Sequence, residues 1–113
     1  MSAITTHVLD TAKGRPGSGI HIVLEYKGME KWDELASGQT NFDGRLPDLL
    51  KEDFHLLEGI YRLTFDTRGY FESQGEQGFY PNVTIAFEVK DPTQHYHVPL
   101  LISPFGYSTY RGS

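Results

Sequence analysis

Val83-Thr84-Ile85-Ala86-Phe87-Glu88-Val89 is the stretch that indicates the fold class most clearly. Its larger apolar side chains stand at every second position, and a period of two residues is typical of a strand with one buried face. Residues 20–26 and 59–66 alternate in the same way. Because the side chains of a strand point alternately to its two faces, all three stretches are predicted to direct one row of side chains into a core.

Weaker patterns on either side complete a β-rich chain. Strands are predicted over residues 4–9, 31–40, 95–102 and 107–111, and the glycine- and proline-rich residues 13–19 are predicted to be a loop. Residues 67–75 form the one candidate helix, which Thr67 would cap and Gly75 would end. Seven to eight short strands with one short helix predict an all-β fold, an antiparallel β-sandwich, with an incomplete barrel as the structural alternative.

Length and composition limit the classes of function. A chain of 113 residues predicts one domain, spanning residues 1–113. The net charge of -5 and the lack of a basic run argue against nucleic acid or an anionic membrane as a partner. The absence of cysteine excludes disulfides and thiolate metal sites. No secretory signal is recognisable, and no apolar segment approaches the ~20 residues that cross a bilayer, so a cytoplasmic protein is predicted.

The last stretch, residues 95–113, carries most of the residues with chemical potential. Strand parity places His95 and His97 on one face and their apolar neighbours on the other, which would pack in the core. Pro99 cannot donate a hydrogen bond to a strand ladder, so it predicts an edge or an irregularity. Leu101 shares the histidine face, which predicts that this face is covered, as it would be by another subunit.

Several segments resemble the transthyretin-related proteins. Residues 95–113 resemble the last segment of that family, and Tyr110-Arg111-Gly112-Ser113 resembles the mark of its 5-hydroxyisourate hydrolase branch. The other matching segments, in the family's order, are Thr6-His7-Val8-Leu9-Asp10, Gly14-Arg15-Pro16, Asp43-Gly44-Arg45 and Phe79-Tyr80-Pro81. The resemblance implies a transthyretin-like sandwich of eight strands with a short helix after the fifth, and a homotetramer with its sites at the dimer–dimer interface.

The same resemblance implies an activity and a set of residues. The activity is hydrolysis of 5-hydroxyisourate to 2-oxo-4-hydroxy-4-carboxy-5-ureidoimidazoline in urate degradation, with no cofactor and no metal. The catalytic residues would be His7, Arg45 and His97, and the substrate-binding residues His7, Arg45, Tyr110, Arg111 and Ser113. These residue types suit the reaction, because histidine can act as a general base near neutral pH and arginine can stabilise an oxyanion. His7 or His97 is favoured over His95 as the base.

Three alternatives stay open. A carrier of small apolar ligands, such as transthyretin, would share the fold, since fold does not decide function. Arg45, His97 and the polar residues 110–113 favour the enzyme, because a carrier of apolar ligands has no use for them. His95 and His97, with His7 as a third ligand, would also match a zinc site, although no carboxylate lies beside them by pattern. An interaction domain with inert histidines is the last alternative.

Overall fold

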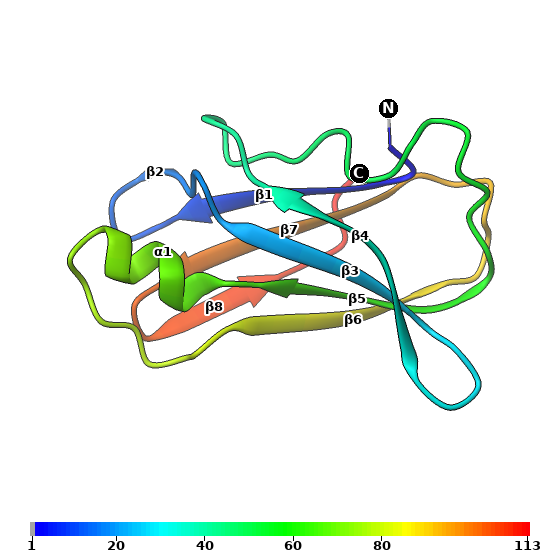
Figure 1. The fold of residues 1–113 in the computed structure, drawn as a ribbon. Coiled ribbons are helices and arrows are strands. Elements are labelled where there is room, and N and C mark those ends of the chain that lie inside the picture. Colours follow the sequence, from blue (N-terminus) through cyan, green and yellow to red (C-terminus); the bar gives the residue numbers. More distant parts are fainter. Residues whose placement is uncertain (1) are drawn as a thin grey trace.

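The computed structural model describes residues 2–113, which form two four-stranded sheets packed face to face (Figure 1). The strand orders are β2-β1-β7-β8 in one sheet and β4-β3-β5-β6 in the other. The elements in chain order are β1 (Ile4–Asp10), β2 (Arg15–Pro16), β3 (His21–Lys27), β4 (Trp32–Gln39), β5 (Gly59–Phe65), α1 (Thr67–Ser73), β6 (Val83–Val89), β7 (Tyr96–Ser103) and β8 (Gly106–Thr109). The predicted sandwich is confirmed, and the alternative of an incomplete barrel is wrong because the strands divide into two separate sheets.

Most predicted strands are confirmed, with shifts of one or two residues at their ends, and β6 has the predicted bounds. β2 lies where a loop was predicted. The predicted helix cap is wrong, because Asp66 occupies that position and its side chain accepts a hydrogen bond from the N–H of Gly69 at 3.0 Å. Thr67 is instead the first helical residue and is buried. A carboxylate that is already aimed at the free N–H groups of the first turn satisfies the helix terminus.

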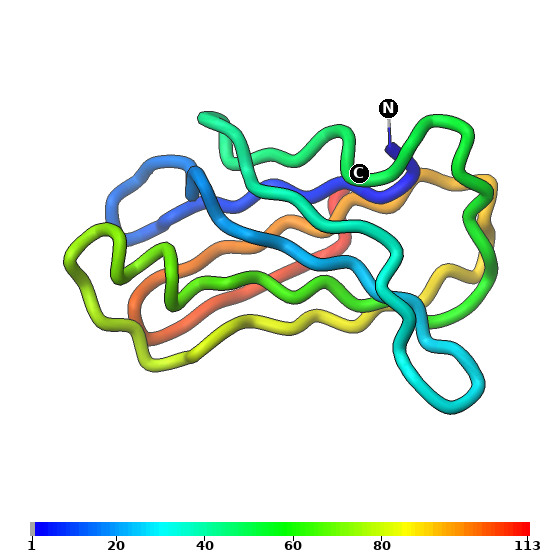
Figure 2. The backbone as a smooth tube through the Cα atoms, in the orientation of Figure 1, coloured from blue at the N-terminus to red at the C-terminus, as the bar shows by residue number. Residues whose placement is uncertain are grey.

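One strand pairing departs from the antiparallel prediction. β1 and β7 pair in parallel, in a register that places Thr5 opposite His97 and His7 opposite Pro99. Figure 2 shows the two ends of the chain side by side, with the blue first strand next to the orange β7. This register brings the histidines of the first strand and of the last stretch onto one sheet face.

The core lies between the two sheets and is built from alternate residues of the strands. The fully buried side chains of β1 and β7 include Val8 and Leu100, and those of the facing sheet include Leu24, Leu63 and Phe65. Full burial of one such side chain contributes about 1.5–3 kcal/mol relative to exposure. Because these rows turn inward, the alternating residues of β1 and β7 face outward, as predicted for His95 and His97.

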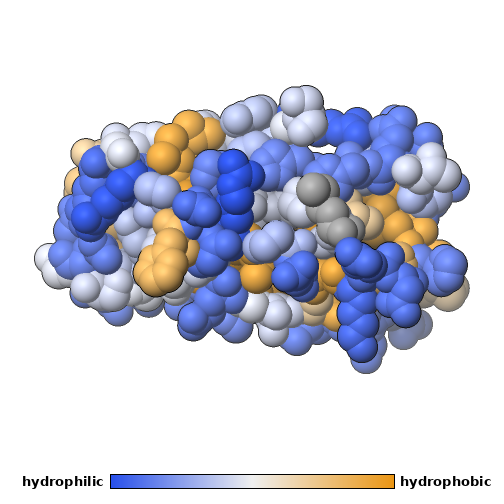
Figure 3. All heavy atoms as spheres, turned by 90° about the horizontal axis from the view of Figure 1, so that it is seen from above, coloured by the Kyte–Doolittle hydropathy of each residue, from blue (hydrophilic) through white to orange (hydrophobic). Residues whose placement is uncertain are grey.

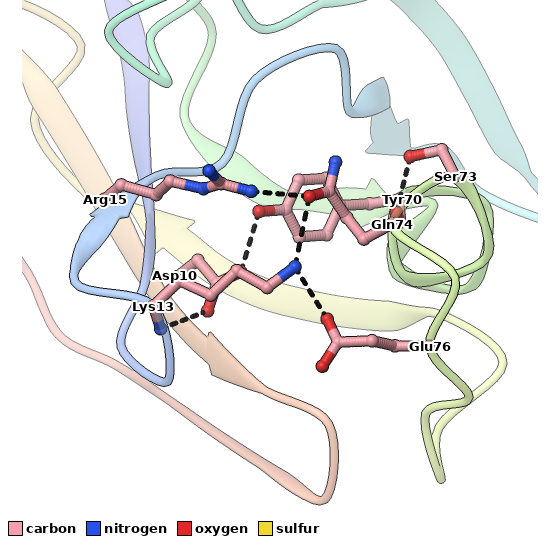
Figure 4. Close-up of polar contacts among 7 residues, drawn as sticks. All are labelled: Asp10, Lys13, Arg15, Tyr70, Ser73, Gln74 and Glu76. Carbon is pink, nitrogen blue, oxygen red and sulfur yellow. Dashed lines mark hydrogen bonds and ion pairs between the residues drawn. The ribbon is translucent and has the colours of Figure 1, made fainter.

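The helix is held against the end of β1 by a buried polar contact (Figure 4). The Tyr70 hydroxyl donates to Asp10 Oδ2 at 2.7 Å, and Asp10 is fully buried. The N–H of Lys13 donates to the other Asp10 oxygen at 3.2 Å. Outside this contact, Lys13 Nζ and Arg15 both donate to Gln74 Oε1, at 3.0 and 2.6 Å. The end of β1 and the loop after it are therefore fixed to α1 and to the residue that follows it.

The surface shows no large apolar band on the face in Figure 3, which is mostly hydrophilic with separate apolar patches. Scattered exposed apolar residues such as Phe42 are usual for a folded domain. Within residues 2–113, the helical segment is far too short and polar to traverse a lipid bilayer.

Candidate functional site

A cavity of about 370 Å³ opens on the outer face of the sheet that contains β1 and β7. Its lining residues come from β1, from the loop after β4 and from the last stretch of the sequence. They are Thr5, Thr6, Arg45, Pro47, His95, His97 and Ser113. Three of the predicted site residues, Arg45, His97 and Ser113, therefore meet at one cavity.

A tight turn places Arg45 in this cavity. The N–H of Val8 donates to the carbonyl oxygen of Gly44 at 2.8 Å, so the turn lies directly against β1. Gly44 has a φ of 74°, and a Cβ at this position would collide with the carbonyl oxygen of Val8, so both the conformation and the close approach require glycine. Asn41 Oδ1 accepts from the N–H of Arg45 at 3.0 Å. Because the turn lies against β1, the backbone of Arg45 forms an isolated antiparallel β-bridge with that of His7.

The last residues reach the cavity because their pairing with β7 resumes after a gap. The β7–β8 ladder starts at Leu100, and an isolated bridge between His97 and Gly112 continues it in the same register. Pro99 lies in the gap, so the predicted irregularity at this proline is confirmed although β7 is an interior strand. The N–H of Gly112 donates to the carbonyl oxygen of His97 at 2.8 Å, which sets Ser113 beside the imidazole.

Thr5 connects His97, on β7, with His95, which directly precedes β7. Its Oγ1 lies 2.8 Å from His97 Nδ1 and 3.0 Å from His95 Nε2, and Thr5 is only 9% exposed. The two imidazole rings are nearly parallel, at 17°, with centroids 6.4 Å apart. One hydroxyl thus orients both rings, each through a different ring nitrogen.

The surroundings of His97 favour its neutral form. Burial lowers the pKa of His97 below its usual value, and the positive charges of Arg45, His95 and His7 lower it further. A neutral imidazole has a lone pair that can accept a proton. The site therefore holds His97 in the state that a general base needs.

His7 lies on the same outer face, two residues along β1 from Thr5. Its backbone forms a β-bridge with that of Arg45, and its side chain is close enough to His97 to affect the pKa of His97, but His7 is not among the residues that line the cavity. The structure therefore places Arg45, His97 and Ser113 at one cavity, with His7 close by and outside its lining.

Tyr110 and Arg111 lie elsewhere. Both line a second cavity, of about 260 Å³, which His97 also lines. The guanidinium of Arg111 stacks over the Tyr96 ring, 4.5 Å from its centroid, and donates to Gln94 Oε1 at 2.9 Å. The structure does not bring these two predicted substrate-binding residues to the cavity that holds Arg45.

Sequence reasoning missed Thr5 as a site residue. The signal was present in part, since Thr5 and His7 share one face of a predicted strand. The missing information was the register between β1 and β7, which only the folded chain provides. The zinc alternative finds no support in the geometry, because within residues 2–113 no three His, Asp or Glu side chains are grouped as metal ligands.

Comparisons with known proteins agree on one family. The model of the HIUase/Transthyretin family matches residues 4–112. Mouse 5-hydroxyisourate hydrolase is 46% identical over 114 aligned residues, which cover 99% of this chain and 96% of the mouse protein. The enzyme of the same name from Salmonella typhimurium is 43% identical over 110 residues, covering 97% of this chain and 80% of the relative.

Solved structures share the fold over the whole chain. Klebsiella pneumoniae 5-hydroxyisourate hydrolase superimposes with a TM-score of 0.85 at 35% identity, covering 97% of this chain and 98% of that one. Sea bream transthyretin in complex with thyroxine superimposes with a TM-score of 0.92 at 29% identity, covering 98% and 95%. Since both the family model and the relatives extend over nearly all of its residues, this chain belongs to the HIUase/Transthyretin family.

Proposed function

We propose that this protein hydrolyses 5-hydroxyisourate in urate degradation, as a hydrolase of a cyclic amide. The observation that carries the proposal is the meeting of Arg45, His97 and Ser113 at one cavity, next to His7, whose backbone pairs with that of Arg45. Relatives in mouse and Salmonella typhimurium carry the name of this enzyme. A cavity of about 370 Å³ is large enough for a small heterocycle.

In the proposed mechanism His97 is the general base. Its Nδ1 is engaged by Thr5, and its Nε2 has no hydrogen-bond partner among residues 2–113. Nε2 takes a proton from water, and the water oxygen attacks a ring carbonyl carbon. Arg45 stabilises the negative charge that develops on the carbonyl oxygen. The C–N bond then breaks, the nitrogen recovers the proton from the imidazolium, and the ring opens to a carboxylate.

His7 and Ser113 have supporting roles in this proposal. His7 is proposed to bind the substrate from β1, where its backbone pairs with that of Arg45, and the Ser113 hydroxyl is proposed as an orienting donor or acceptor at the cavity. Tyr110 and Arg111 lie outside the cavity, so we leave them out of the residues that contact substrate within one chain. The site needs neither a metal nor another cofactor for this chemistry.

We also propose a homotetramer whose sites lie at the dimer–dimer interface, in a cytoplasmic protein of one domain. The supporting observation is that the cavity opens on an outer sheet face that also carries the half-buried Leu9 and Leu101, which are direct neighbours across β1 and β7. A second subunit on this face would cover both leucines and close the cavity. Light scattering during gel filtration measures the mass, and a mass of one chain would contradict the assembly.

The experiment that tests the activity follows the ultraviolet decay of 5-hydroxyisourate freshly made from urate. Wild-type protein should accelerate the spontaneous decay. His97→Ala should lower the rate by about 10²–10⁴-fold, the usual contribution of a general base. His21→Ala is the matched control, because His21 is exposed on β3 of the other sheet. A wild-type protein that leaves the spontaneous decay unchanged would contradict the proposal.

A small-molecule carrier is the second candidate. The observation in its favour is the TM-score of 0.92 with a transthyretin that binds thyroxine. Two imidazoles and a guanidinium at the cavity argue against it, because an apolar ligand would leave these groups without partners. Calorimetric titration with thyroxine should show no binding at micromolar concentration, and stoichiometric binding there would favour the carrier.

A further inference from the structure

We propose that Thr5 is a positioning residue whose hydroxyl sets the tautomer of His97 and links it to His95 in one hydrogen-bond chain. The inference deepens the proposed function and rests on it. It starts from two distances at one oxygen, since Thr5 Oγ1 lies 2.8 Å from His97 Nδ1 and 3.0 Å from His95 Nε2.

The number of hydrogens on this oxygen limits how the chain can be arranged. A threonine hydroxyl has one hydrogen to donate and two lone pairs to accept with. It can therefore donate to only one of two neutral imidazoles and must accept an N–H from the other. Either His97 donates through Nδ1 and Thr5 donates to His95 Nε2, or both directions are reversed. The two rings consequently hold the same tautomer, Nδ1–H on both in the first arrangement and Nε2–H on both in the second.

Electrostatics selects the first arrangement. Arg45 and His97 line the same cavity, and because Thr5 engages Nδ1, Nε2 is the ring nitrogen of His97 left to meet the groups of that cavity. A lone pair on Nε2 is attracted to the Arg45 cation, whereas an N–H at Nε2 is repelled by it. Arg45 therefore favours Nδ1–H on His97, which donates to Thr5. The lone pair of Nε2 is then available to take a proton from water.

His95, at the other end of this hydrogen-bond chain, can accept the hydrogen bond that Thr5 donates in the first arrangement. His95 is exposed, so in the Nδ1–H tautomer its remaining N–H is satisfied by water. Thr5 itself is 9% exposed and has little access to water, so its hydroxyl depends on the two imidazoles for partners. The buried Thr5 hydroxyl thus keeps its two partners, and the exposed His95 takes the tautomer that this hydroxyl requires. The partner of the other ring nitrogen decides which nitrogen of His97 carries the proton.

The test compares three variants that differ in one hydroxyl. Thr5→Val removes the hydroxyl and keeps the shape and the strand preference, whereas Thr5→Ser keeps the hydroxyl. Thr64→Val is the matched control, because it removes a hydroxyl that contacts Thr84 on the other sheet. Thr5→Val should lower kcat by about 10–100-fold, the range found for partners that orient metal-bound imidazoles. KM should change little, Thr5→Ser should recover most of the rate, and Thr64→Val should equal wild type.

A second readout does not depend on activity. Nitrogen NMR of the imidazoles assigns the protonated nitrogen of neutral His97, which should be Nδ1 in wild type and should shift toward Nε2 in Thr5→Val. A wild-type spectrum with the proton on Nε2, or a Thr5→Val enzyme with wild-type kcat, would overturn the inference. If wild-type protein has no hydrolase activity, the proposed function fails, and the wild-type spectrum still decides the arrangement at Thr5. The wild-type spectrum also decides it if Thr5→Val does not fold.

Discussion

Gly112 lies directly over the imidazole of His97. Its N–H donates to the carbonyl oxygen of His97 at 2.8 Å, and a Cβ built on Gly112 would stand 2.5 Å from Cδ2 of the ring. Cδ2 is bonded to Nε2, the nitrogen that we assign as the base. The absence of a side chain at residue 112 therefore allows the last residues to pass the site without displacing its central ring.

Gly112→Ala should accordingly lower the activity more than the stability. The ring is held by Thr5 on its other side, so either the imidazole or the strand must shift, and shifts of this kind in a catalytic group are costly. We expect a fall in kcat of about tenfold or more, with a small change in Tm. Gly106→Ala is the control, since a Cβ there meets only Ser103 Oγ at an ordinary 3.7 Å. Equal rates for the two variants would contradict this account of Gly112.

The acid limb of the pH profile should lie below the usual range for histidine. Burial, followed by Arg45, His95 and His7, lowers the pKa of His97 from 6.5, so the neutral base persists at pH values where an ordinary histidine is half charged. The rate should fall only as the pH drops below 6.5 toward this lowered pKa. Below pH 6.5 the unfolded chain also binds a proton at His97 more readily than the folded chain. The free energy of unfolding therefore decreases as the pH falls.

His95→Gln should raise the pKa of His97. The substitution removes one of the charges that disfavour the imidazolium and retains a polar partner for Thr5. Proton NMR titration of the His97 ring measures the shift, and the acid limb of kcat/KM should move in the same direction. His55→Gln is the control, because His55 is exposed in the irregular segment between β4 and β5. A pKa of His97 that stays the same or falls in His95→Gln would contradict the prediction.

Asn41→Ala should weaken the placement of Arg45. Asn41 Oδ1 accepts from the N–H groups of Asp43 and Arg45, at 2.9 and 3.0 Å, so its loss releases the turn that carries the guanidinium. Activity should fall by about three- to tenfold, in line with one or two lost hydrogen bonds of about 0.5–1.5 kcal/mol each. Asn82→Ala, in the exposed segment before β6, should retain full activity, and steady-state kinetics compares the two.

Tyr70→Phe should destabilise the fold without changing the site. The variant removes the donor to the buried carboxylate of Asp10, which costs about 1–3 kcal/mol in the free energy of unfolding. Urea denaturation measures the loss, with the exposed Tyr107→Phe as control. An unchanged urea midpoint at neutral pH would show that the contact with Asp10 contributes nothing.

The same contact predicts a dependence on alkaline pH. Burial and Asp10 raise the pKa of Tyr70 from 10.0 to about 12 in the folded protein. Between these values the unfolded chain has lost the proton and the folded chain retains it, so stability falls as the pH rises. The difference in stability between wild type and Tyr70→Phe should therefore narrow from pH 10 toward pH 12. A difference that stays constant over this range would contradict the raised pKa.

The sequence by itself determined the elements and their faces. The period of two residues in β3, β5 and β6 is a local property, since successive side chains of any strand alternate between its faces. The outward direction of His95 and His97 followed from the same rule. The turn that precedes Arg45 was also local, because asparagine, aspartate and glycine tolerate its backbone geometry.

The tertiary structure alone decided which of these residues meet. Thr5 lies beside His97 because β1 and β7 pair in parallel in one register, and no local pattern specifies a partner strand from the other end of the chain. Another non-local pairing, the bridge between His97 and Gly112, lies between Arg111, stacked on Tyr96, and Ser113, which lines the cavity. Strand pairing depends on how all the rows of apolar side chains pack into a common core, so the composition of the site was settled only when the whole chain folded.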